Sequence, residues 1–484
     1  MQKIPSLLLA VLLLWGCNVQ SPPTGADPVQ TSLEYQPWES RPKSAGSAAY
    51  LGLGTNAKVL CSGVFVSKRL PEEAFANSSS IILDPQYLPD INYEIDTILK
   101  QVRVHLGDSI TRSATYHGSQ GCIIDAPSGL QFEPVQVQSS LPEAGSVDWP
   151  MGDRLTTNTE MYDQENLQKV IDKAFDPDAL TAAFLVVHKG AIILEHYDNG
   201  ANKDTQLESW SMGKSLTATL IGRLIQQGKL SLEQKAPIKE WAREGDPRGV
   251  ITIKDLLQMS SGLSFSSHHD PEVKVPIAQL EHMFIYTEAI NVFDFAVNRP
   301  LEFPIGSTGR YRNCDPLSLG YIFRQLVEAD GQNYWTWPQK ELFDKIGIRE
   351  QILETDRFGN FIMTGFDYGT ARNWGRLGML YLQDGIWNGD RLLPEGFVDF
   401  VSTPAPAWEE PEYGGLFWLN EVDTYPALPK DAYAMRGGGG QNTIIVPSLD
   451  LVVVRQGHSL GGSHALASLN AALESLVEVL AVAR

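Results

Sequence analysis

Positive charge is scarce in this sequence. Its 484 residues include 38 Lys and Arg against 58 Asp and Glu, which gives a formal net charge of −20. A protein that binds nucleic acid or an anionic lipid surface needs local positive charge, and no Lys- or Arg-rich block compensates for the deficit. We therefore expect no nucleic acid partner, and contact with a membrane only through a lipid anchor.

Cysteine and histidine are also few, with 4 and 9 residues, and none of them has the spacing of a zinc site. The nearest approach to a metal site is His268-His269-Asp270. Adjacent side chains diverge in any regular element, so we interpret this group as a solvated loop. The sequence predicts no metal and no organic cofactor.

The first residues resemble the signal of a bacterial lipoprotein. Lys3 begins a short charged start, residues 7–14 form an apolar run too short to span a membrane, and Cys17 ends a lipobox-like stretch. The resemblance implies that residues 1–16 are cleaved and that Cys17 carries lipid. Asn18 beside it implies the periplasmic face of the outer membrane of a Gram-negative bacterium. An ordinary signal peptide with an unmodified cysteine is the alternative.

Three cysteines then remain for the folded chain. An exported protein can form disulfides, so we predict that Cys61 pairs with Cys122 and that Cys314 is a buried thiol.

The composition divides the chain into a tether and two units. Residues 17–45 are Pro-rich without an apolar period and predict a tether. Residues 46–150 predict a small β-rich module without catalytic groups, and residues 155–484 predict a larger second unit. The strand-like runs of the module are 59–66, 95–106 and 121–124.

The second unit is expected to be α+β. An amphipathic helix from Leu167 to Phe175 precedes two strand-like runs, and two further runs precede a closing helix striped with leucine. We expect one antiparallel sheet flanked by these terminal helices, with a helical subdomain inserted between its halves. The strand-like runs are 183–188, 191–197, 443–446 and 450–455, and the inserted helices are 253–259, 277–297, 316–328 and 374–383.

Ser211 stands in the first turn of another predicted helix, which stops near Gly228. Unpaired N–H groups and the helix dipole favour negative charge there. Lys214 follows three residues later on the same face, and a lysine that burial keeps neutral can deprotonate a serine. The pattern alone is weak, because Ser40 and Lys43 repeat it in the tether, where a capping serine and a solvated lysine suffice.

The second unit resembles the serine hydrolases related to class C β-lactamases and penicillin-binding proteins, nearest to the branch of the 6-aminohexanoate-dimer hydrolases and carboxylesterases. The resemblance runs in family order through Ser211–Lys214, Lys254–Leu263, Pro304–Gly306, Tyr311–Asn313, Ala371–Gly378, Asp384–Pro394 and Gly439–Gln441. It implies the β-lactamase/DD-peptidase-like fold and Ser211 as the nucleophile. It also implies that Lys214 and Tyr311 move the proton, with the phenol pKa lowered by the lysine ammonium.

The substrate-binding residues implied by the resemblance are Asn313, Gly440 and Gln441. In place of the family's Lys-Thr/Ser-Gly strand the chain has a glycine run after Arg436. Such a strand lets substrate approach the backbone, and an N–H near Gln441 would pair with that of Ser211 as an oxyanion hole. The missing lysine argues against β-lactam hydrolysis, and for Arg436 we expect a surface role.

These observations predict an exported serine hydrolase that cleaves a small-molecule ester or amide through an acyl-enzyme. The alternatives are a catalytically silent relative that binds cell-wall fragments or a partner, and a β-lactamase or D-amino-acid peptidase. Gly457-His-Ser459-Leu-Gly461 matches the elbow of α/β-hydrolases, but no aspartate follows it before a histidine, so we interpret it as a strand-to-helix turn.

Overall fold

A six-stranded antiparallel sheet, with strand order β12-β13-β14-β15-β5-β6, forms the centre of the second unit. Its middle joins segments from far apart in the sequence, because β15 pairs with β5 along the full length of both strands. The strands are β5 Thr181–His188, β6 Ala191–Tyr197, β12 Trp418–Leu419, β13 Tyr433–Gly437, β14 Gln441–Val446 and β15 Leu451–Gly457. The computed structural model describes residues 45–82, 84–156, 162–270 and 275–482, so the predicted signal peptide and Cys17 lie outside the described residues.

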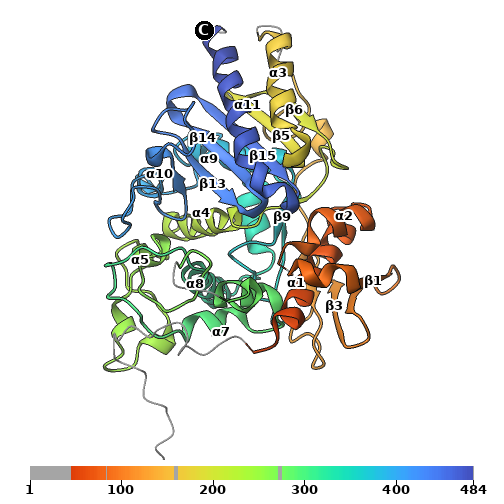
Figure 1. Cartoon of the computed structure of the whole chain (residues 1–484). Helices are drawn as coiled ribbons and strands as arrows, with labels where there is room; N and C mark the ends of the chain where they lie inside the picture. The colour runs from red at the N-terminus through yellow and green to blue at the C-terminus, as the bar shows by residue number, and fades with distance from the viewer. Residues whose placement is uncertain (1–44, 83, 157–161, 271–274, 483–484) are drawn as a thin grey trace, which may run out of the picture.

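Both faces of this sheet are covered by helices (Figure 1). Phe184 and Val186 of β5 face α3 (Gln164–Ala174) and α11 (Gly462–Val482), whereas Leu185 and Val187 face α9 (Ala371–Leu382). Successive side chains of a strand point to opposite faces, which explains why β5 is apolar at nearly every position. The predicted α+β fold with terminal helices on an antiparallel sheet is confirmed.

The C-terminal helix α11 is long and apolar enough to cross a membrane by length and composition. Its leucines, among them Leu469, Leu473 and Leu476, are instead buried against the sheet and α3. These contacts are those of a core helix.

The helical subdomain lies below α4 (Met212–Gln226) in Figure 1. The single helix expected over residues 277–297 is wrong, because this segment forms a short turn and two helices. Asn291 starts the second of them by accepting a hydrogen bond from the backbone N of Asp294. The elements are α5 Ile253–Leu257, η9 Ile277–Gln279, α6 Glu281–Thr287, α7 Val292–Val297 and α8 Cys314–Ala329. Helix α10 (Phe397–Val401) lies apart from them, above α4 in Figure 1.

The N-terminal unit combines helices with a four-stranded sheet. The strand expected over residues 59–66 is wrong, because these residues belong to helix α1, which is buried on nearly all sides. A helix buried all round has no apolar stripe, so periodicity could not distinguish it from a strand. The elements are α1 Ala48–Phe65, α2 Pro71–Asn77, η2 Ser79–Ile82, β1 Ile91–Asp96, β2 Gln101–Leu106, β3 Ile110–Tyr116 and β4 Cys122–Ile124.

The sheet of this unit ends before residue 150, where the sequence predicts the boundary of the unit, and that boundary stays a prediction. The sheet finishes with β4, and residues beyond it contact the second unit, as where the hydroxyls of Ser139 and Ser140 both donate to Asp344. The predicted module is therefore a mixed α/β unit up to about Ile124, followed by a segment that lies on its neighbour.

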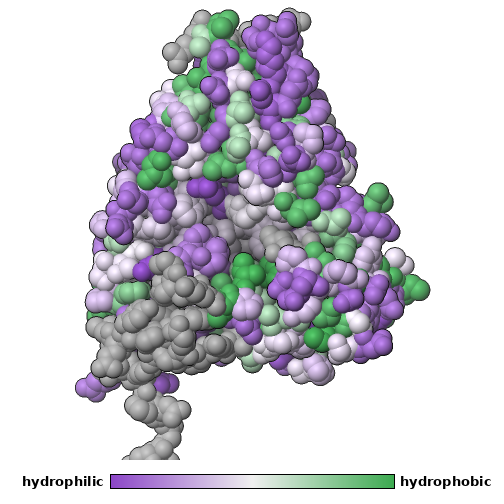
Figure 2. All heavy atoms as spheres, in the orientation of Figure 1, coloured by the Kyte–Doolittle hydropathy of each residue, from purple (hydrophilic) through white to green (hydrophobic). Residues whose placement is uncertain are grey.

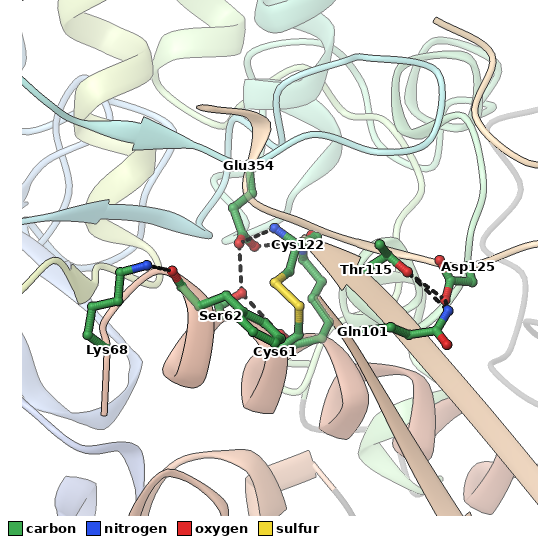
Figure 3. The surroundings of a disulfide bond; sticks show 10 residues. Cys61, Ser62, Lys68, Gln101, Thr115, Cys122, Asp125 and Glu354 are labelled. Atoms are coloured by element: carbon green, nitrogen blue, oxygen red, sulfur yellow. Dashed lines mark hydrogen bonds and ion pairs between the residues drawn. A yellow bond between two sulfur atoms is a disulfide. The ribbon is translucent and has the colours of Figure 1, made fainter. Parts of the chain in front are cut away.

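A disulfide joins Cys61 of α1 to Cys122 of β4, as the sequence predicted (Figure 3). Cys314 is a buried free thiol. Beside the disulfide, the carboxylate of Glu354 accepts hydrogen bonds from the Ser62 hydroxyl at 2.7 Å and the Cys122 N–H at 2.8 Å. Its other oxygen lies 2.6 Å from the Lys58 ammonium in a fully buried ion pair. Glu354 belongs to the second unit, so this cluster fixes the two units to each other.

Candidate active site

Ser211 lies at the start of α4, half-buried at the wall of a pocket. The preceding residue, Trp210, has a left-handed backbone with φ of 46°, which turns the chain sharply into the helix. Among the described residues, nothing accepts a hydrogen bond from the Ser211 N–H. This donor therefore remains available to a ligand oxygen, at the helix end where negative charge is favoured.

Lys214 lies one turn further, with its side chain beneath the serine. Its Nζ is 2.9 Å from Ser211 Oγ and 2.9 Å from the carbonyl oxygen of Thr364. Burial holds the pKa of Lys214 well below its usual value of 10.5, against the opposing effect of the Asp367 carboxylate. A lowered pKa raises the fraction of uncharged amine, which is the form that can accept the serine proton.

Tyr311 closes the group from the helical subdomain. Its ring centre is 4.9 Å from the Lys214 Nζ, and its hydroxyl is hydrogen-bonded to Ser211. The expectation that its pKa is lowered is wrong: burial raises the pKa of Tyr311, and the hydrogen bond with Ser211 opposes this only in part. Tyr311 is therefore a neutral phenol, and it lies beside the desolvated amine of Lys214. The phenol can donate a proton.

The glycine run after Arg436 reaches the serine at a different place from the one expected. A Cβ on Gly437 would lie 2.1 Å from the Ser209 carbonyl oxygen and 3.0 Å from the Ser211 nitrogen. Only glycine permits this approach, so the backbone of Gly437 and Gly438 borders the pocket beside the nucleophile.

Gly440 and Gln441, which the resemblance implied as substrate-binding, do not line the pocket. The Gln441 amide is buried, where it donates to the Gly457 carbonyl at 2.6 Å and accepts from the Gly457 N–H at 2.9 Å. The guanidinium of Arg455 binds the Gly440 carbonyl at 2.9 Å from behind. These contacts fix the glycine run, which is a structural role.

Asn313 is also removed from the pocket. It is fully buried, and its amide donates to the His282 carbonyl at 2.7 Å and to the Tyr286 hydroxyl at 3.2 Å. His282 and Tyr286 line the pocket, so Asn313 supports the wall rather than reaching substrate.

The pocket has a volume of about 520 Å³, and the molecular surface is hollowed near the centre of the face in Figure 2. Much of its wall comes from the segments 264–302 and 408–418, and some lining residues were assigned differently from the sequence. Arg436, expected at the surface, lines it with its guanidinium over Trp418, and His268 and His269, expected in a solvated loop, also line it. The lining side chains are Ile82, Trp210, Ser211, His268, His269, Ile277, His282, Met283, Tyr286, Tyr311, Glu412, Trp418 and Arg436.

Ser459, in the elbow-like motif, has no catalytic surroundings. Its hydroxyl donates to Glu208 at 2.7 Å and accepts from the Trp210 indole at 2.9 Å. The neighbouring His458 ring contacts the Asn199 carbonyl instead. This serine holds Trp210 in position, in agreement with its interpretation as a turn residue.

The family model described as Beta-lactamase matches residues 167–475. The 6-aminohexanoate-dimer hydrolase of Paenarthrobacter ureafaciens is 23% identical over 300 residues, which are 57% of this chain and 72% of that protein. A solved putative 6-aminohexanoate-dimer hydrolase from Bacillus anthracis superposes with a TM-score of 0.52 at 20% identity, over 74% of this chain and 89% of that one. A penicillin-binding protein homologue from Caulobacter crescentus gives a TM-score of 0.51 at 17% identity, over 67% and 99%.

Proposed function

The chain belongs to the Beta-lactamase family of serine hydrolases, and from this premise we propose that it cleaves an ester or amide bond through an acyl-enzyme on Ser211. The observation that carries the proposal is the 2.9 Å contact between Ser211 Oγ and the buried amine of Lys214. A binding protein without activity would have no need of a desolvated lysine at this distance from a serine.

In the proposed reaction Ser211 Oγ attacks the substrate carbonyl while Lys214 takes the hydroxyl proton. The negative oxygen of the tetrahedral intermediate is held by the Ser211 N–H together with the backbone at Gly437 and Gly438. Tyr311, a neutral phenol beside the lysine, donates a proton to the leaving alcohol or amine and regains one from Lys214. Water then attacks the acyl-enzyme by the same route in reverse.

The pocket supports a carboxylesterase or amidase in preference to an enzyme for highly charged substrates. Its described charged side chains are Arg436 and Glu412, one of each sign, and most of the remaining wall is aromatic or aliphatic. Apolar and aromatic walls bind the uncharged parts of esters and amides through the hydrophobic effect.

The test is covalent labelling by a fluorophosphonate, followed by intact mass. We expect one adduct on the wild type and none on Ser211→Ala. Ser215→Ala is the matched control, since Ser215 lies in the same helix but donates to the Leu416 carbonyl, and it should still be labelled. A folded wild-type protein that takes no label would refute the proposal. Labelled protein is then tested on short-chain esters, linear amides and a β-lactam.

We also propose that the protein is exported and held by lipid on Cys17 at the periplasmic face of an outer membrane. The disulfide between Cys61 and Cys122 supports export, because disulfides persist in oxidising compartments. Metabolic labelling with a fatty acid analogue should mark the wild type and leave Cys17→Ala unmarked.

A further inference from the structure

One wall of the pocket comes from the N-terminal unit. Ile82 ends the short helix η2, is 3% exposed, and lies outside the residues that match the family model. The pocket is also lined by Ile277 of η9 and Met283 of α6. The elements η2 and η9 both pack on α1, and η9 also packs on α6, so these three side chains belong to one side of the pocket.

This side of the pocket is apolar, and the charged groups are elsewhere. Arg436 comes from β13, and Glu412 precedes β12 beside Trp418, at the wall formed by the edge of the central sheet. A charged or strongly polar substrate group against Ile82, Ile277 and Met283 would lose water without gaining a partner. An alkyl chain placed there would gain free energy with each methylene that it buries.

The N-terminal unit is fixed firmly enough to define the shape of this wall. The hydroxyl of Thr55 in α1 donates to the Tyr286 carbonyl at 3.0 Å, and Tyr286 itself lines the pocket. Arg112 of β3 pairs with Glu288 at 3.1 Å, just beyond α6. Together with the buried ion pair of Lys58 and Glu354, these contacts fix the N-terminal unit to the second unit at three places.

We propose that the N-terminal unit is a specificity element: Ile82, with Ile277 and Met283, forms an apolar subsite that binds an alkyl chain of the substrate. The proposal rests on the hydrolase function proposed above and adds a substrate class to it. It also gives the unit a role that the family domain alone does not supply, since residues 45–124 lie outside the matched region.

The test measures kcat/KM on two series of esters, p-nitrophenyl alkanoates of rising acyl length and alkyl 4-nitrobenzoates of rising alcohol length. In the series whose growing chain enters the subsite, the wild-type kcat/KM should rise about fourfold for each added methylene until the subsite is filled. Ile82→Trp fills the subsite, so kcat/KM for the longest esters of that series should fall at least about tenfold relative to kcat/KM for the acetate or methyl ester. Ile277→Trp, at a side chain that is 39% exposed, should act in the same direction with less risk to folding.

Ile98→Trp is the matched control, because Ile98 belongs to the same unit but is 91% exposed on the turn between β1 and β2. Its length profile should equal that of the wild type. Unchanged profiles in both Ile82→Trp and Ile277→Trp, with fluorophosphonate labelling of Ser211 retained, would overturn the subsite while the hydrolase function stands. A folded wild type that is neither labelled nor active on either series would overturn the hydrolase function and the subsite with it.

Discussion

Replacing Lys214 by methionine tests the mechanism at its centre. Methionine has nearly the length of lysine and suits a buried position, so the change removes the base without opening a cavity. The Thr364 carbonyl loses its 2.9 Å contact with the amine, but the Tyr286 hydroxyl also donates to it at 3.2 Å. The fold should therefore be retained.

The expected loss of activity follows from the role of a general base, which accounts for about 10² to 10⁴ in rate, or about 2.7 to 5.4 kcal/mol of barrier. Stability should change in the other direction. The unfolded chain binds a proton on Lys214 more tightly than the folded chain does, so the lowered pKa costs free energy of folding at pH values below 10.5. Lys214→Met removes this cost, so its free energy of unfolding should equal or exceed that of the wild type.

The pH dependence gives the sharpest measurement. Only the uncharged amine accepts a proton, so wild-type kcat/KM should rise with pH through the lowered pKa of Lys214 and level off well below 10.5. The wild-type free energy of unfolding, relative to Lys214→Met, should also rise with pH between that lowered pKa and 10.5, since over this range the unfolded state binds more protons.

The assay is hydrolysis of a short p-nitrophenyl ester from about pH 5 to pH 10, with urea unfolding of the same samples. Lys254→Met is the control, because Lys254 is exposed and pairs with Glu233 on the surface. Two results would refute the assignment of Lys214 as the base. One is a Lys214→Met protein that keeps activity within about tenfold of wild type, and the other is a wild-type kcat/KM profile whose rise is centred near pH 10.5.

Three further results are expected. Tyr311→Phe keeps the ring but removes the proton donor, so kcat should fall about 10²- to 10⁴-fold with an unchanged circular dichroism spectrum; activity near wild type would contradict the role. Gly437→Ala forces the strand away from the nucleophile and should lower kcat at least about tenfold, whereas Gly145→Ala, where a Cβ meets only the Glu143 side chain at 3.8 Å, should not. Lys58→Met leaves Glu354 buried without its ion pair and should lower the free energy of unfolding in urea by about 3 to 5 kcal/mol. The double variant Lys58→Met/Glu354→Leu should recover part of this loss. Equal stability of the single and the double variant would contradict the reasoning.

Predictions from local patterns succeeded where an apolar run is bounded by turn residues, as in the helix that begins at Ser211 and in the strands 181–188 and 451–457. They failed for α1, whose small and apolar residues are buried on all sides, and for residues 277–297, where capping by Asn291 interrupts the helical pattern.

The predictions for the candidate site also succeeded for some residues and failed for others. Ser211, Lys214 and Tyr311 could be proposed from spacing and order along the chain, and the structure brings them into contact. Asn313 and Gln441 were implied as substrate-binding residues by the family resemblance, yet both side chains are buried in hydrogen bonds with their own neighbours.

The sequence by itself therefore determined the family, the antiparallel sheet with its terminal helices, and the disulfide. Only the tertiary structure decided the protonation of the site and the shape of the pocket. The pKa values of Lys214 and Tyr311 depend on burial by segments hundreds of residues apart, and the approach of Gly437 to Ser211 depends on how β13 packs against α4. Likewise, Ile82 reaches the pocket only because a separate unit is fixed against the catalytic one, and no local pattern in the chain encodes that contact.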